Sequence, residues 1–141
     1  MKIVVMDGQG GGIGAAIIKA IRERLGHGVE VLALGTNSIA TSRMMKAGAN
    51  RGATGENAVV RTCATVEWIV GPLSIVLANS MMGEMTPAMA SAVSTSPARK
   101  ILIPLIQEEV TVVGMRSEPL PHLVEEVILI LESAQGGPKD V

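Results

Sequence analysis

The sequence predicts an α/β protein, a three-layer sandwich in which helices cover both faces of a mostly parallel sheet of about five strands. Two observations favour this class. Short continuous apolar runs, typical of strands buried on both faces, alternate with segments of helical periodicity. The first apolar run also leads through a glycine-rich turn into a helix, as in a parallel crossover unit. At 141 residues, the chain is expected to form one domain over residues 1–134, with a flexible tail over 135–141.

The first half of the chain contains the clearest crossover unit. Residues 3–6 form the first predicted strand, and apolar residues then recur with a period near 3.6 from Ile13 onward. Gly26 stands where that helix is expected to end, and residues 29–34 read as the second strand. Three further elements are expected here: a short helix over about 39–46, a glycine-rich loop over 47–57 and one or two helical turns over 57–64.

The second half contains the remaining predicted strands. Residues 67–70 and 100–103 read as the third and fourth strands, and each is followed directly by a proline-containing turn. Residues 110–113 follow the fourth strand so closely that we expect an antiparallel strand at the edge of the sheet. Three helices are expected in this half: one over 73–82, one that begins at Thr86 and Pro87, and one with an apolar stripe formed by Leu120, Leu123, Val124, Val127, Ile128 and Leu131.

Composition excludes several classes of protein. A net charge of −1, a single tryptophan and no phenylalanine or tyrosine argue against a nucleic-acid partner. The lone Cys63 excludes an internal disulfide and a cysteine-rich zinc site, and the histidines and acids show no metal-ligand spacing. No apolar stretch is long enough to span a membrane, and the start does not resemble a signal peptide. We therefore expect a soluble cytoplasmic protein.

The turn Gly8–Gly14 is the strongest candidate for a binding site. It lies between a strand and a helix, where free backbone N–H groups and a partial positive charge favour an anion. Glycines without Cβ atoms would let phosphate oxygens approach; alternatively, they serve only close packing of helix on strand. The candidate ligand contacts lie at the ends of three strands: Gly8, Gln9, Gly10, Gly11, Gly12, Ile13, Gly14, Gly35, Thr36, Asn37, Ser38, Gly71 and Pro72. Alternatively, Asn37 or Ser38 only caps the helix that follows the second strand.

The first 38 residues resemble the nucleotide-binding turn of short-chain dehydrogenases/reductases. Gly8, Gly12 and Gly14 fit that family's G-x-x-x-G-x-G spacing, while Gly10 and Gly12 with Ala15 fit G-x-G-x-x-A. The second strand, however, ends without the acid that holds ribose hydroxyls, and the chain contains no tyrosine for reductase chemistry. The resemblance therefore does not extend to that reaction.

Over most of residues 3–126 the chain resembles a family of short, functionally uncharacterised bacterial proteins. The resemblance rests on "DGQGGGIG", "LGTNSIAT", "KAGANRGATGENA", "GPLSIVLANSMMGEMTP" and "PLPHLVEE". It implies a Rossmann-like fold and no particular activity.

Three carboxylates are candidates for acid or base chemistry. Asp7, beside the first glycine, is either a turn-capping residue or a general base in the crevice. Glu56 lies in the glycine-rich loop, and Glu84 is accompanied by methionines that favour a core or a subunit interface. His122 is a weaker candidate near the rim of the crevice. No residue is expected to bind a metal.

Three functions remain open from the sequence. The first is a module that binds a nucleotide or another phosphorylated metabolite, with NAD(P) or an ATP-like compound as the cofactor and Thr36–Ser38 on its ribose or second phosphate. The second is a small enzyme that acts on a phosphorylated metabolite. The third is a structural or regulatory dimer without a ligand. The interface of that dimer would be the methionine-rich segment 81–89 or an exposed edge strand. A homo-oligomer, most simply a dimer, is expected for this protein.

Overall fold

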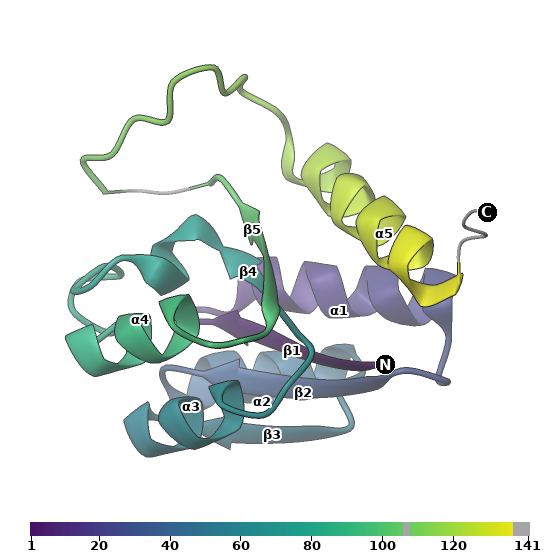
Figure 1. The fold of residues 1–141 in the computed structure, drawn as a ribbon, viewed down its shortest axis with the longest axis horizontal. Coiled ribbons are helices and arrows are strands. Elements are labelled where there is room, and N and C mark those ends of the chain that lie inside the picture. Colours follow the sequence, from purple (N-terminus) through teal and green to yellow (C-terminus); the bar gives the residue numbers. More distant parts are fainter. Residues whose placement is uncertain (106–107, 137–141) are drawn as a thin grey trace.

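The protein, described here as a computed structural model, folds around one five-stranded sheet with the order β3-β2-β1-β4-β5 (Figure 1). The structure describes residues 1–105 and 108–136. Every described strand pair is parallel, and the order is that of the Rossmann fold. The α/β class is therefore confirmed. The strands are β1 (Lys2–Asp7), β2 (Glu30–Gly35), β3 (Arg51–Thr54), β4 (Trp68–Pro72) and β5 (Arg99–Ile103).

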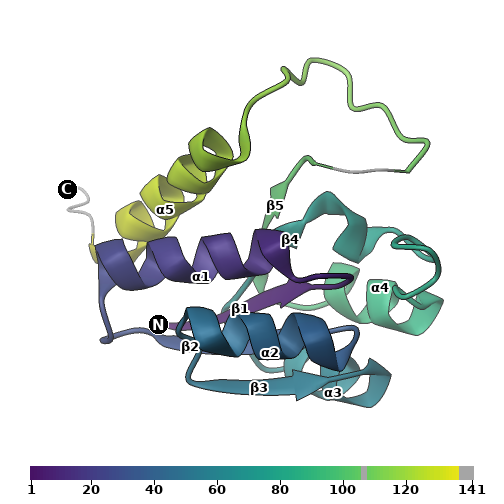
Figure 2. The same cartoon turned by 180° about the vertical axis from the view of Figure 1, so that it is seen from behind.

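Helices cover both faces of the sheet (Figures 1 and 2). One face packs against α1, α2 and α5, and the other packs against α3 and α4. The core is built almost entirely from isoleucine, valine, leucine, alanine and methionine, as the composition requires. The helices are α1 (Gly12–Leu25), α2 (Ser38–Ala47), α3 (Glu56–Cys63), α4 (Pro87–Ser94) and α5 (Leu120–Gly136), with a 3₁₀ turn η1 (Leu73–Val76).

The predicted caps explain where several helices begin and end. The side chain of Thr86 accepts a hydrogen bond from Met89 N, and Pro87 occupies the first turn of α4, both as expected. Asn37 is the N-cap of α2, since its Oδ1 accepts from Ala40 N at 2.9 Å. Gly26 ends α1 with a φ of 72°, a conformation that glycine adopts at little cost.

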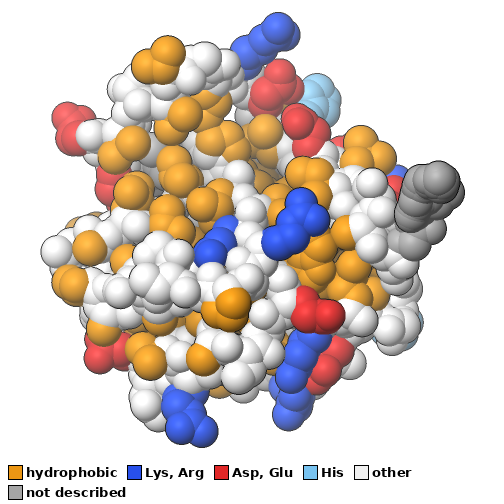
Figure 3. All heavy atoms as spheres, viewed as in Figure 1, with side chains coloured by type: hydrophobic (Ala, Val, Ile, Leu, Met, Phe, Trp, Pro, Cys, Tyr) orange, Lys and Arg blue, Asp and Glu red, His pale blue; other side chains and the backbone are white. Residues whose placement is uncertain are grey.

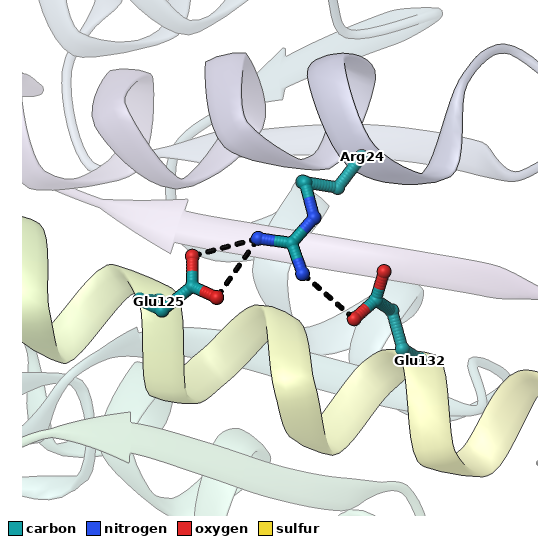
Figure 4. Close-up of polar contacts among 3 residues, drawn as sticks. All are labelled: Arg24, Glu125 and Glu132. Carbon is teal, nitrogen blue, oxygen red and sulfur yellow. Dashed lines mark hydrogen bonds and ion pairs between the residues drawn. The ribbon is translucent and has the colours of Figure 1, made fainter.

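Helix α5 lies beside α1 on one face of the sheet and buries the apolar stripe predicted for it. Leu123, Val124, Val127, Ile128 and Leu131 are buried, and Leu120 packs against them. Arg24 of α1 donates to Glu125 and Glu132 of α5 (Figure 4). These ion pairs are solvent-exposed and therefore contribute little to stability, so the buried stripe holds the helix in place.

The fifth strand is not the one predicted. Residues 110–113 form no strand, and the edge beside β2 is instead β3, which runs parallel. The sequence Arg51-Gly-Ala-Thr54 lacks an apolar run because all four residues are exposed. The expected antiparallel edge strand is therefore wrong, since residues 110–113 have strand propensity but no pairing partner among the described residues.

The predicted helix over 73–82 is also wrong beyond its first turn. After η1 the chain forms consecutive turns, with positive φ at Asn79, Met81 and Met82. A helix cannot continue through left-handed residues, and the periodicity of apolar residues does not reveal them. At the other end of the chain, α5 includes residues 135 and 136 of the predicted tail, and residues 137–141 lie outside the described residues. Among the residues that the structure describes, no helix is long and apolar enough to cross a membrane.

Candidate functional site

The candidate site lies at the carboxyl edge of the sheet. Register pairs Asp7 with Gly35 and Gly35 with Thr54, so β1, β2 and β3 end side by side. Pro72 pairs with Ile103 in the same way at the ends of β4 and β5. The strand order reverses between β1 and β4, which is where open α/β sheets bind ligands. The predicted meeting of the strand ends is therefore present.

Asp7 is buried at the end of β1 and binds the backbone of the glycine turn. Its Oδ1 accepts from Gly8 N at 2.8 Å, and its Oδ2 accepts from Gly14 N in the first turn of α1 at 2.7 Å. Burial raises the pKa of Asp7, while the hydrogen bonds from Gly14, Gly8 and Ile13 and the charge of Arg43 oppose that rise. These contacts favour the turn-capping interpretation of Asp7.

Three glycines of the turn are required by packing within the chain. A Cβ at Gly8 would lie 2.5 Å from both the Met81 sulfur and Thr36 Oγ1. Gly11 has a φ of 73°, and a Cβ there would lie 2.9 Å from backbone atoms of Ala40 in α2. A Cβ at Gly14 would meet the Met44 sulfur at 2.5 Å and the Cβ of Asp7 at 3.0 Å. Gly11 and Gly14 thus allow close packing of the turn and α1 against α2 and β1, and Gly8 allows close packing against Thr36 and Met81.

Gly10 and Gly12 have no such reason to be glycine. A Cβ at Gly10 would be 3.9 Å from its nearest neighbour and one at Gly12 3.5 Å, both ordinary contacts, and neither residue has a positive φ. In both cases the neighbour is the guanidinium of Arg43 on α2, which also donates to Gly10 O at 3.3 Å. Among the described residues, no acceptor binds the backbone N–H of Gly10 or Gly12. Two backbone donors without an acceptor among the described residues and the exposed cation of Arg43 therefore lie close together.

Sequence reasoning did not identify Arg43. It lies in the middle of α2, well after the polar residues 36–38 at the end of β2. Its long side chain reaches the turn because α1 and α2 lie side by side (Figure 2). The available signal was a cation on the helix that follows the second strand, which the fold places beside the first turn.

Glu84 joins two of the predicted loops. Its Oε1 accepts from Gln9 N at 2.8 Å, Thr36 Oγ1 at 2.6 Å and Asn37 Nδ2 at 2.9 Å. Desolvation opposes ionisation of Glu84, but the hydrogen bonds from Thr36, Gln9 and Asn37 outweigh it and lower its pKa. The structure thus brings together residues from positions 9, 36–37 and 84.

A cavity of about 330 Å³ lies at the point where the strand order reverses. Its polar wall includes the carboxylates of Asp7 and Glu108, and Glu108 Oε2 accepts from Met81 N at 2.9 Å. Two carboxylates make this cavity unfavourable for a phosphate, so the side of the turn that faces Arg43 suits an anion better. The remaining residues around the cavity are Ile13, Pro72, Ser74, Met81 and Leu105.

Gly35 and Gly71, both predicted ligand contacts, are buried against the chain itself. A Cβ at Gly35 would collide with Thr41 and lie 2.7 Å from Asn37 O, and one at Gly71 would collide with Met6 O. Ser38 is exposed at the start of α2. Beside it, an open hollow of about 530 Å³ is lined by Ser38, Ile39, Ser42, Arg43 and Lys46.

The other candidates lie apart from the glycine turn or bind elsewhere. Glu56, at the start of α3, accepts from Thr86 Oγ1 at 2.6 Å and so joins α3 to α4. His122 is exposed and lies 3.2 Å from Glu118. Cys63 is buried, and burial raises the pKa of its thiol to about 11, which makes it a poor nucleophile. In the described ranges, no three His, Cys, Asp or Glu side chains come together to hold a metal ion.

Comparison with known proteins shows the family. The family model described as "Domain of unknown function (DUF3842)" matches residues 2–135. No curated protein matches the sequence. Among solved structures, the chain is similar to the dodecameric FMN-dependent Ubix-like decarboxylase from Escherichia coli O157:H7. The two are 19% identical, with 96% of this chain and 77% of that chain covered and a TM-score of 0.46.

Proposed function

The chain belongs to the DUF3842 family, whose description names no activity, and we propose from its own residues that it binds a phosphorylated small molecule. The phosphate would lie against Gly10 and Gly12, under the guanidinium of Arg43. The proposal rests on one observation: these two glycines are not needed by the fold, and their N–H groups have no acceptor among the described residues.

Electrostatics supports an anion at this place and not deeper in the crevice. The amino end of α1 carries a partial positive charge, and part of it is already used by Asp7 through Gly14 N. The N–H groups of Gly10 and Gly12 and the charge of Arg43 remain for a ligand. A guanidinium can bind two phosphate oxygens at once, which gives the site both charge and geometry.

The predicted contacts at the end of β2 fit a narrower role. Thr36 and Asn37 already donate to Glu84, so their side chains are less free to bind a ribose than the sequence suggests. The hollow on α2 beside Arg43 offers Ser38, Ser42 and Lys46 instead. A nucleotide or dinucleotide, NAD(P) or ATP-like, could place a hydroxyl or a second phosphate there.

A second candidate function is an enzyme that acts on such a metabolite. The observation in its favour is the cavity at the strand reversal, where the carboxyl of Asp7 is buried and its pKa is raised. In this arrangement Asp7 would be the acid or base, and the Asp7→Asn variant would bind ligand but not turn it over. Glu56 and Glu84 are less suited, because each accepts hydrogen bonds that join elements of the fold.

The proposal is tested by thermal-shift measurements with ATP, ADP, NAD, NADP, flavin mononucleotide, sugar phosphates and inorganic phosphate. A ligand at 100 times its dissociation constant stabilises the protein by about 2.7 kcal/mol. We expect at least one compound to raise the melting temperature, and Arg43→Gln to weaken its binding about tenfold or more. Arg61→Gln, an exposed arginine on α3, is the matched control and should bind normally. The absence of any shift, or an equal effect of both variants, would contradict the proposal.

A further inference from the structure

A long arm, residues 108–119, leaves the body of the protein between β5 and α5 (Figures 1 and 2). None of its residues is buried. Val110, Val112, Val113 and Met115 are 41%, 41%, 95% and 43% exposed, although Val110-Thr-Val-Val113 has the composition of a strand. So many large apolar side chains on one projecting segment indicate that another surface covers them.

A second exposed surface lies along β5, at the edge of the sheet from which the arm leaves. β5 is at the edge of the sheet and has β4 as its partner in the described part of the chain, so its outer backbone groups are open to pairing. Beside the start of β5, a groove of about 440 Å³ is lined by Arg99, Leu129, Ile130, Ser133 and Ala134. Leu129 and Ile130 are 51% and 42% exposed. Figure 3 shows hydrophobic side chains gathered on this face of the molecule.

We propose that a second copy of this chain occupies this surface, in a dimer that pairs the two β5 edges antiparallel and exchanges the arms. A two-fold axis makes edge strands run antiparallel, so the carboxyl end of one β5 lies beside the amino end of the other. The arm leaves from the carboxyl end, and the groove lies at the amino end, next to Arg99. Each arm therefore reaches the partner's groove, and the assembly closes at two copies.

Charge complementarity supports a second copy as the occupant. The arm begins with Glu108 and Glu109, and Glu109 is exposed. Arg99 stacks on the Trp68 ring, with its guanidinium carbon 4.6 Å from the ring centre. Among the described residues, Arg99 has no ion pair. Opposite charges thus accompany matching apolar surfaces on the arm and in the groove, which favours this partner over an unrelated apolar one.

The first test is sedimentation velocity at micromolar protein concentration. We expect the unmodified protein to be a dimer and Val113→Lys to raise the dimer dissociation constant at least tenfold. Ile39→Lys is the matched control, because Ile39 is 71% exposed on α2, away from the arm and β5. It should remain a dimer. A monomeric protein, an assembly larger than two copies, or a dimer that survives Val113→Lys would overturn the proposal.

The second test exchanges the charges between the arm and the groove. Arg99→Glu and Glu109→Arg should each weaken the dimer, and the double variant should recover most of the lost affinity because the pair is restored with opposite orientation. Loss of the Trp68 contact alone could not produce this recovery. Circular dichroism confirms that each variant is folded. A double variant no more dimeric than Arg99→Glu would overturn the proposed pairing.

Discussion

The glycine turn contains two kinds of glycine with different surroundings. At Gly8, Gly11 and Gly14, the space for a side chain is already filled by Thr36, Ala40, Met44 or neighbouring atoms of the chain. At Gly10 and Gly12 the space is open except for ordinary contact with Arg43. The first kind allows close packing within the chain, and the second leaves open space beside the backbone. A dense glycine motif therefore combines a packing requirement with an approach to the backbone.

The neighbouring pair Gly11 and Gly12 gives the largest expected difference. Gly11→Ala should lose about 2–4 kcal/mol of unfolding free energy, because a left-handed alanine and a collision with the Ala40 backbone add together. Gly12→Ala should stay within about 1 kcal/mol of the unmodified protein, since alanine suits a first helical turn. Urea denaturation of both variants measures this. Equal losses at the two positions would mean that Gly12, too, serves packing.

Two carboxylates beside the glycine turn, Glu84 and Asp7, should make the stability of the protein depend on pH in different ways. The folded-state pKa of Glu84 is lowered below its ordinary 4.5, so its stabilisation is present above that pH and is lost as pH falls through the folded value. The pKa of Asp7 is raised above its ordinary 3.8, so its contribution is fully present below that pH and is lost as pH rises through the folded value. The contributions of Glu84 and Asp7 to the free energy of unfolding therefore change in opposite directions with pH.

We expect modest effects, since Glu84 is partly solvated. Relative to Glu84→Gln, the unmodified protein should lose its advantage in unfolding free energy toward acid pH. Relative to Asp7→Asn, it should gain toward acid pH. Urea midpoints at a series of pH values from about 3 to 7 measure both differences. Parallel pH profiles for the two variants would show that the carboxylates do not differ in this way.

The sequence predicts correctly those parts of the fold that are determined by residues close together in the chain. The first strand, its glycine turn and the caps at Asn37 and Thr86 follow from residue types and spacing. The edge strand β3 could not be predicted because its residues are exposed and short of apolar side chains. The left-handed turns at Met81 and Met82 could not be predicted either, because residues other than glycine rarely adopt a positive φ.

The candidate site was predictable to the same extent. Asp7, Thr36 and Asn37 stand at strand ends, and parallel topology brings strand ends together. That Glu84 would bind across both loops depends on the irregular segment before it, which has no periodic pattern. Arg43 acts at a distance along a helix, so only the packing of α2 against α1 brings it to the turn.

The most direct test of the two kinds of glycine is an NMR titration of ¹⁵N-labelled protein with inorganic phosphate. We predict that the amide signals of Gly10 and Gly12 and the side-chain signal of Arg43 shift most. The amides of Gly8 and Gly14, already bonded to Asp7, should change little. No shifts at Gly10 and Gly12, or the largest shifts elsewhere, would contradict the account.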